Sequence, residues 1–133
     1  MSHIVTGTVQ IKRTEIEALG RAVEHFGAKL EARDTFRSYQ GNQSCEQVIG
    51  KGLSGSYEIG LRRKANSEVY ELAYDSWGPG GWITQTFGAK LQKLHDRFLA
   101  EVATDEFTSQ GMTTTIEETD EGLVIEGVTY ATE

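Results

Sequence analysis

The sequence predicts an α+β domain in which two helices pack on one face of a mostly antiparallel sheet, and three observations predict it. Apolar residues recur every three or four positions in two separate segments, which is the period of an amphipathic helix. Apolar and polar residues alternate in shorter segments joined by polar turns, the pattern of half-buried strands in hairpins. No repeated βα alternation occurs, so we expect no doubly wound parallel fold. The expected order is β-α-β-β-β-β-α-β-β.

The first strand and the first helix follow from local signals. Residues 4–11 are rich in β-branched side chains and predict a strand. Thr14 and Glu17 have the spacing of a capping box, which marks the start of a helix. Gly27 supplies the left-handed stop, so a helix is predicted over 14–26.

The middle of the chain predicts strands separated by turns. Four segments combine apolar or aromatic residues with mixed or alternating polarity: 29–39, 46–49, 57–61 and 70–74. We expect a turn at 40–42, a glycine-rich loop over 50–56 and a polar turn at 64–67. The last two strands should therefore form a hairpin.

A second helix is predicted over 84–106. Its apolar residues follow one another at steps of four, three, four and four, which makes one stripe: Phe87, Leu91, Leu94, Phe98 and Val102. Gly111 stops this helix, and segments 112–118 and 123–130 form a closing hairpin around a turn at 119–122.

Length and composition favour one domain spanning residues 1–133, because a chain of 133 residues can bury a core without staples. No apolar run is long enough for a membrane helix, and we expect no secretory signal. Cys45 is the single cysteine, which favours a reducing, cytoplasmic compartment. The net charge of −7 favours solubility, argues against nucleic-acid binding and permits a basic partner.

Two sequence features point to anion binding. The glycine loop reads Gly50-Lys51-Gly52-Leu53-Ser54-Gly55, the spacing of a dinucleotide fingerprint, but a strand rather than a helix is predicted after it. Its backbone N–H groups and Lys51 could still cradle a phosphate, or the segment is an ordinary mobile loop. Arg62-Arg63-Lys64 is the one basic cluster, suited to a phosphate, a carboxylate or an acidic partner, or a solvated turn.

Aromatic residues predict a binding surface. Trp77 and Trp82 flank a loop of glycines and proline, where one indole packs on the sheet and the other anchors a partner, or both belong to the core. A polar-aromatic strand surface is expected from Arg37, Tyr39, Gln40, Tyr57, Tyr70 and Tyr74.

The candidates for catalysis and metal binding are few. His3, His25 and His95 lack the spacing of metal ligands, so no metal and no cofactor is expected. Asp75 near Trp77, and Glu71 within a strand, are the only acids with notable neighbours. Cys45 is interpreted as an inert, half-buried residue, and no catalytic residue is assigned.

The chain resembles, over nearly its whole length, a family of small uncharacterised proteins. These are hypothetical conserved reading frames of cyanobacteria and algal plastids, with bacterial and phage relatives and a domain-of-unknown-function label. The resemblance depends on the Met1-Ser2-His3 opening, Val9-Gln10-Ile11-Lys12, the helix from Ile16 to Gly27, Arg37-Ser38-Tyr39-Gln40-Gly41, Tyr57-Glu58-Ile59-Gly60, Tyr70-Glu71-Leu72-Ala73-Tyr74-Asp75, Leu91 and Asp96-Arg97-Phe98. Ser38 in place of a glycine and the Trp77–Trp82 loop depart from the family pattern. The resemblance implies a cyanobacterial, bacterial or phage origin and supplies no catalytic residues.

Three functional hypotheses follow. The leading one is a non-enzymatic binding or adaptor protein that recognises a protein partner through the polar-aromatic surface. The alternative is a binder of a phosphate-bearing ligand or nucleotide, which could sequester a signal as small phage proteins do, through Lys51, Arg62 and Arg63. The third is an enzyme that uses Asp75 or His25. The oligomeric state stays open: an exposed edge strand invites homodimerisation by sheet pairing, with the hairpin at 112–130 as the expected donor.

Overall fold

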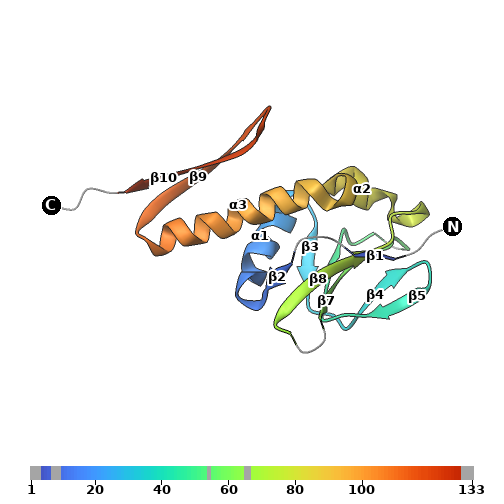
Figure 1. Cartoon of the computed structure of the whole chain (residues 1–133). Coiled ribbons are helices and arrows are strands. Elements are labelled where there is room, and N and C mark those ends of the chain that lie inside the picture. Colours follow the sequence, from blue (N-terminus) through green and yellow to red (C-terminus); the bar gives the residue numbers. More distant parts are fainter. Residues whose placement is uncertain (1–3, 7–9, 54, 65–66, 130–133) are drawn as a thin grey trace.

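The computed structural model describes residues 4–6, 10–53, 55–64 and 67–129. It confirms the α+β class, because helices and antiparallel strands share one core (Figure 1). The Met1-Ser2-His3 opening, residues 7–9 of the first expected strand, the middle of the turn at 64–67 and Tyr130 lie outside the described residues.

The main sheet is antiparallel and has the order β1-β8-β7-β6-β3. β2 also pairs with β8, at residues further toward the start of β8 than those that pair with β1. Its described strands are β1 (Val5–Thr6), β2 (Ile11–Lys12), β3 (Lys29–Glu31), β6 (Gln47–Gly50), β7 (Ile59–Arg63) and β8 (Val69–Tyr74). The predicted hairpin is present as β7 and β8, in a register that places Leu61 opposite Leu72. Further hairpins are formed by β4 (Thr35–Ser38) with β5 (Gly41–Ser44) and by β9 (Met112–Thr119) with β10 (Gly122–Thr129).

The first helix begins slightly differently from the prediction. A 3₁₀ turn, η1 (Arg13–Glu15), precedes α1 (Ile16–His25), and the Lys12 N–H donates to Glu15 Oε1 at 2.9 Å. This carboxylate therefore caps the turn in place of the expected Thr14–Glu17 box. Gly27 ends the helix as predicted, with a φ of 80° that favours glycine.

The second predicted helix is broken, so the described residues contain three α-helices rather than two. After η2 (Gly78–Gly80), α2 (Gly81–Phe87) ends at Gly88, and η3 (Ala89–Leu91) leads into α3 (Gln92–Ser109). Lys90 and Leu91 both have positive φ, at 55° and 60°, which no continuous helix permits. The predicted stripe still packs inward across the break, because Phe87 before it, Leu91 within it and Leu94 after it are all fully buried. Along the described stretches, every helix is too short or too polar to cross a membrane.

The helices cover one face of the sheet, as predicted. The buried side chains of this layer come from the three helices and from alternate positions of the strands, including Leu19, Val23, Ile49, Ile59, Leu61, Leu72, Phe87, Leu94 and Phe98. The opposite face carries Val48, Gly60 and Ala73, and the Phe36 side chain of β4 packs there.

The predicted strand over 29–39 is two strands with different roles. Its first part, β3, pairs with β6 at the edge of the main sheet, whereas its second part, β4, pairs with β5 and lies over the other face. The turn expected at 40–42 is only partly right, since Gly41 to Ser44 extend as β5. This strand has no apolar side chain, so its sequence carries no period-two signal.

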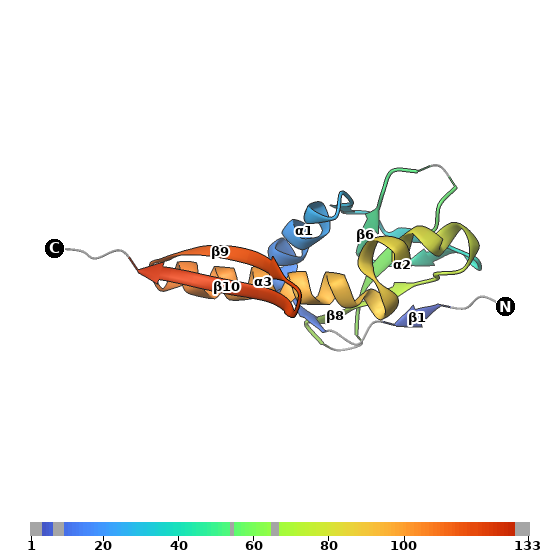
Figure 2. The ribbon, with the colours of Figure 1, turned by 90° about the horizontal axis from the view of Figure 1, so that it is seen from above.

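The closing hairpin is confirmed as a ribbon of two strands that stands apart from the main sheet. Both strands pack along α3, and the view from above shows the ribbon lying lengthwise over that helix (Figure 2). The ribbon therefore extends the molecule at the end opposite η2 and the β4–β5 hairpin (Figure 1).

Candidate functional site

The candidate site is an aromatic pair formed by Tyr39 and Trp77. The two rings meet edge to face, with their centroids 6.0 Å apart and their planes at 88°. Both side chains remain exposed, Tyr39 by 58% and Trp77 by 56%. Edge-to-face contact is a favourable geometry for aromatic rings, so the two residues form a single apolar surface from distant parts of the sequence.

The β4–β5 turn holds Tyr39 in place. The buried Ser38 hydroxyl donates to the Gly41 carbonyl at 2.9 Å and accepts from the Gln40 N–H at 3.2 Å. Gly41 has a φ of 91°, which a residue with a side chain adopts only with strain. Gln40 therefore takes part in the turn through its backbone N–H while its side chain is exposed, and Tyr39 extends from a turn that these hydrogen bonds close.

The segment after β8 holds Trp77. Asp75 is 1% exposed, and its Oδ1 accepts the Trp77 N–H at 3.0 Å, which is an Asx turn. The Gly80 N–H donates to the Trp77 carbonyl at 3.0 Å. A Cβ on Gly80 would lie 1.8 Å from the Asp75 carbonyl oxygen, so the loop closes this tightly only with glycine.

The two tryptophans have different environments. Trp82 is half-buried, packs against the hydrophobic core and donates from Nε1 to the Tyr57 carbonyl at 2.8 Å. The Lys51 ammonium lies 5.8 Å from the centroid of its indole ring, within the range of a cation–π contact. Trp82 thus anchors the loop to the segment before β7, whereas the Trp77 indole is exposed.

Arg37 is a framework residue of this region. Its guanidinium donates to the Ser56 carbonyl at 2.9 Å, and its N–H donates to Glu58 Oε1 at 3.0 Å. Glu58 is buried and also pairs with Arg33. These contacts tie β4 to the segment before β7, which fixes the base of the turn that carries Tyr39.

The glycine loop and the basic cluster lie apart. Lys51 follows β6, whereas Arg62 and Arg63 lie at the other end of the β6–β7 pair, about 20 Å away by strand rise. A hollow of about 240 Å³ beside the loop has mixed charge, with Lys29, Glu31, Arg33, Lys51 and Glu58 among its lining residues. The structure therefore does not gather the three cations of the phosphate hypothesis at one site.

Both arginines of the basic cluster have acidic neighbours. Arg62 lies 3.8 Å from Glu71 on the facing strand, and Arg63 lies 2.9 Å from Glu46. The Arg63 guanidinium also covers the Tyr70 ring and donates to its hydroxyl at 3.2 Å. These contacts are cross-strand pairs of the kind that stabilise a sheet.

Tyr74 does not belong to the surface on which it was expected. It is 3% exposed and faces the helices, and burial raises the pKa of its hydroxyl. Tyr70 is buried on the same side. The alternation of side chains along β8 explains why the expectation of exposed tyrosines is wrong. Tyr70 and Tyr74 point to the same side as Leu72, toward the helices, whereas Phe36 packs on the other face of the sheet.

The remaining reactive side chains have structural surroundings. Burial raises the pKa of the Cys45 thiol to about 11, so this thiol is protonated at neutral pH. His95 is buried in α3, and burial lowers its pKa. His25 is exposed at the end of α1, against the Phe26 ring. Within the described ranges, no three His, Cys, Asp or Glu side chains come together as a metal site.

Sequence reasoning missed the residues that fix the aromatic pair. Ser38 and Gly80 were not singled out as positioning groups, although a serine two residues before Gln40 fits a side-chain turn. The closeness of Gly80 to the Asp75 carbonyl has no sequence signal, because it depends on how the loop folds back.

No protein-family model matches the chain, and no curated protein or solved structure is found to be similar to it. The resemblance to the cyanobacterial and plastid family therefore stays a prediction. The function has to be inferred from the surface itself.

Proposed function

We propose that this chain is a small, non-enzymatic binding or adaptor protein of a reducing cytoplasm, and that it recognises a protein partner through Tyr39 and Trp77. One observation carries the proposal: two large aromatic side chains, 38 positions apart, touch each other and are both more than half exposed. Exposed tryptophan and tyrosine are costly to a monomer and are enriched at the energetic centres of interfaces.

Preorganisation supports this interpretation. Each aromatic residue extends from a turn that is closed by a buried polar side chain, Ser38 in one case and Asp75 in the other. Little backbone freedom is lost when such a surface binds, so more of the contact energy appears as affinity.

The acid considered for catalysis has a positioning role in this proposal. Asp75 is buried, and one of its carboxylate oxygens accepts the N–H of the very residue that forms the anchor. A carboxylate enclosed in this way orients Trp77 through that oxygen.

Affinity capture from a lysate of the native host tests the proposal. The wild-type chain, Trp77→Ala and Tyr39→Ala are compared with Leu53→Ala, which removes another exposed apolar side chain from a different loop. We expect a captured protein that both aromatic variants lose and the Leu53 variant retains. Truncation of an interface hot spot should weaken binding by roughly 30-fold or more.

Titration with the purified captured protein then measures the affinities directly. Trp77→Phe should recover part of the binding, because it restores an aromatic ring at the anchor. Equal capture and equal affinity for the wild type and Trp77→Ala would overturn the proposal. Circular dichroism spectra that match the wild type ensure that the variants are folded.

A further inference from the structure

The β9–β10 ribbon has a free face and free edges. Its alternate residues Met112, Ile116, Leu123 and Ile125 are half-buried, on the side that packs along α3, whereas the alternate set is exposed. Val124 on that second face is 49% exposed. Among the described residues, β9 and β10 pair only with each other, so the outer edge of each strand offers unpaired backbone N–H and C=O groups.

The β10 edge lacks several of the devices that usually prevent pairing. Edge strands are commonly short or carry lysine, proline or a bulge. Each strand of the ribbon is 8 residues long, their register is continuous, and residues 112–129 contain neither lysine nor proline. The edge is therefore suited to accept an additional strand.

The net negative charge of the chain is concentrated in its last 24 residues, which include the ribbon. Residues 110–133 contain six of the 20 acidic residues and none of the 13 basic ones, so they carry six of the seven net negative charges. The rest of the chain is close to neutral. Two such ribbons would repel each other edge to edge, so a second copy is a poor occupant and a basic segment is a complementary one.

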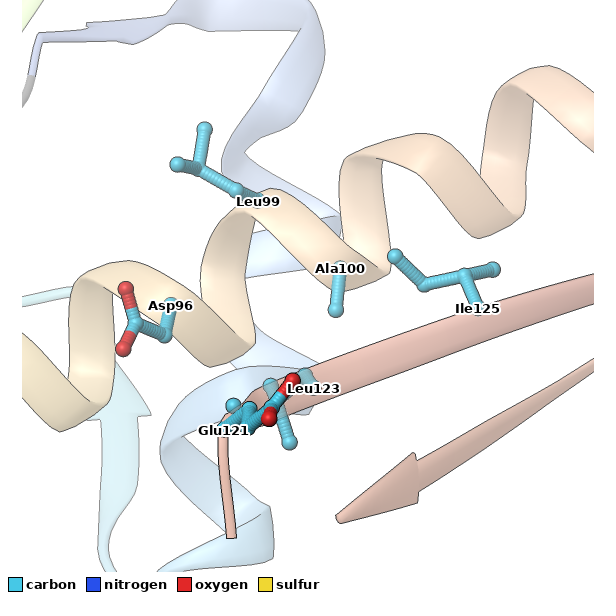
Figure 3. Close-up of a pocket in the computed structure, with 7 residues that line it drawn as sticks. Asp96, Leu99, Ala100, Glu121, Leu123 and Ile125 are labelled. Atoms are coloured by element: carbon cyan, nitrogen blue, oxygen red, sulfur yellow. The ribbon is translucent and has the colours of Figure 1, made fainter. Parts of the chain in front are cut away.

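A hollow beside β10 provides a place for side chains of an added strand. It has a volume of about 330 Å³ and lies between α3 and the ribbon. Figure 3 shows Asp96, Leu99 and Ala100 on the helix side and Glu121, Leu123 and Ile125 on the ribbon side. Leu99 is 55% exposed, and the lining of the hollow also contains the carboxylates of Asp96 and Glu121.

We infer that the outer edge of β10 binds an extended, basic segment of another protein as a third strand of the ribbon. The backbone of that segment pairs with β10. One of its apolar side chains enters the hollow at Leu99 and Ile125, and its lysine or arginine side chains, which alternate with the apolar ones, lie near Glu126 and the turn residue Glu121. This surface is separate from the Tyr39–Trp77 pair, at the other end of the molecule (Figure 1).

Binding of a designed peptide to the full chain tests the inference. The probe is an octapeptide of alternating lysine and valine, titrated into ¹⁵N-labelled protein. The first control peptide replaces lysine by glutamate. Two further control peptides keep all the side chains but carry N-methyl groups on alternate backbone amides. One is methylated at the odd positions and the other at the even positions, because either set of amides could be the one that faces β10. N-methylation removes the donors needed for strand pairing and leaves the charge unchanged.

We expect the lysine–valine peptide to shift the amide resonances of β10 and of Leu99, and the glutamate peptide to shift none. At least one N-methylated peptide should bind roughly tenfold more weakly. The double variant Glu121→Lys, Glu126→Lys should also lose about tenfold in affinity, whereas Glu17→Lys, Glu24→Lys makes the same charge change on α1 and should lose much less. Trp77→Ala should leave the affinity unchanged.

Three results would overturn the inference. One is the absence of β10 shifts at saturating peptide. Another is equal binding of the unmodified peptide and both N-methylated peptides, which would leave only charge attraction. The third is concentration-dependent dimerisation of the protein alone with shifts confined to β9 or β10, which would assign the edge to a second copy.

Discussion

At the scale of single residues, one glycine of β7 determines how the β4–β5 hairpin packs against the main sheet. The Phe36 ring lies on Gly60, and a Cβ at that position would be 2.2 Å from Phe36 Cδ1. Phe36 is fully buried there, so the β4–β5 hairpin and its Tyr39 turn depend on the absence of a side chain in β7. The sequence shows only a glycine inside an alternating strand, which indicates a close neighbour without naming it.

Gly60→Ala should therefore destabilise the protein by about 1–3 kcal/mol, the usual cost of overpacking a filled core. Urea unfolding followed by circular dichroism measures this change. Gly81→Ala is the matched control, because nothing lies within 4 Å of the added Cβ. Gly81 has a φ of −60°, so alanine fits there and should be neutral or stabilise by up to about 1 kcal/mol. Equal stability of the two variants would show that Phe36 moves aside without cost.

At the scale of elements, the sequence predicted the apolar faces better than the breaks between segments. The stripe from Phe87 to Val102 indicated one helix, yet the chain leaves the helix at Gly88 and resumes it at Gln92. Apolar spacing reports which residues face the core, and both packed helices satisfy it. Likewise β5 escaped detection, because its stability comes from pairing with β4 and not from apolar residues of its own.

An ion cluster joins α1 to α3. The buried Glu101 carboxylate accepts from Arg21 Nε at 2.9 Å and from Arg97 Nε at 3.0 Å. The hydrogen bond to Glu101 is also the main reason that the pKa of Arg21 is raised. Arg97 and Glu101 are four positions apart on α3, whereas Arg21 and Glu101 are 80 positions apart and no sequence pattern linked them.

Glu101→Gln should destabilise the protein by about 2 kcal/mol, because it removes a charge-assisted acceptor from two guanidinium groups. Part of the effect is screened, since the Arg21 side chain is 41% exposed. Glu24→Gln, at an exposed position on α1, should change stability by less than about 0.5 kcal/mol. Thermal and urea unfolding of both variants make the comparison, and matching losses would contradict a role for the cluster.

At the scale of the whole molecule, a packed sheet with helices on one face continues through α3 into a ribbon that packs along that helix. The predicted class and the closing hairpin are both confirmed. The independence of the hairpin from the main sheet was not predicted, because local alternation defines a strand but not its neighbours. The same limit applies to the aromatic pair, whose two residues meet only through the tertiary fold.

This arrangement predicts two levels of stability, measurable by native-state hydrogen exchange. A two-stranded ribbon is marginal in water, and β9 and β10 have half-buried residues on one side only. Their amides should therefore exchange through a local opening, several-fold to many-fold faster than those of β7 and β8, which should exchange only on global unfolding. Ile125→Ala should speed exchange across the ribbon and leave β7 and β8 unchanged, because Ile125 lies between the ribbon and α3 and not in the main sheet. Exchange of the ribbon at the global rate would instead mean that the ribbon and the sheet unfold together.

If the ribbon does open separately, pairing of a third strand to β10 should slow the amide exchange of the ribbon. The stability of the ribbon would then depend on binding at β10.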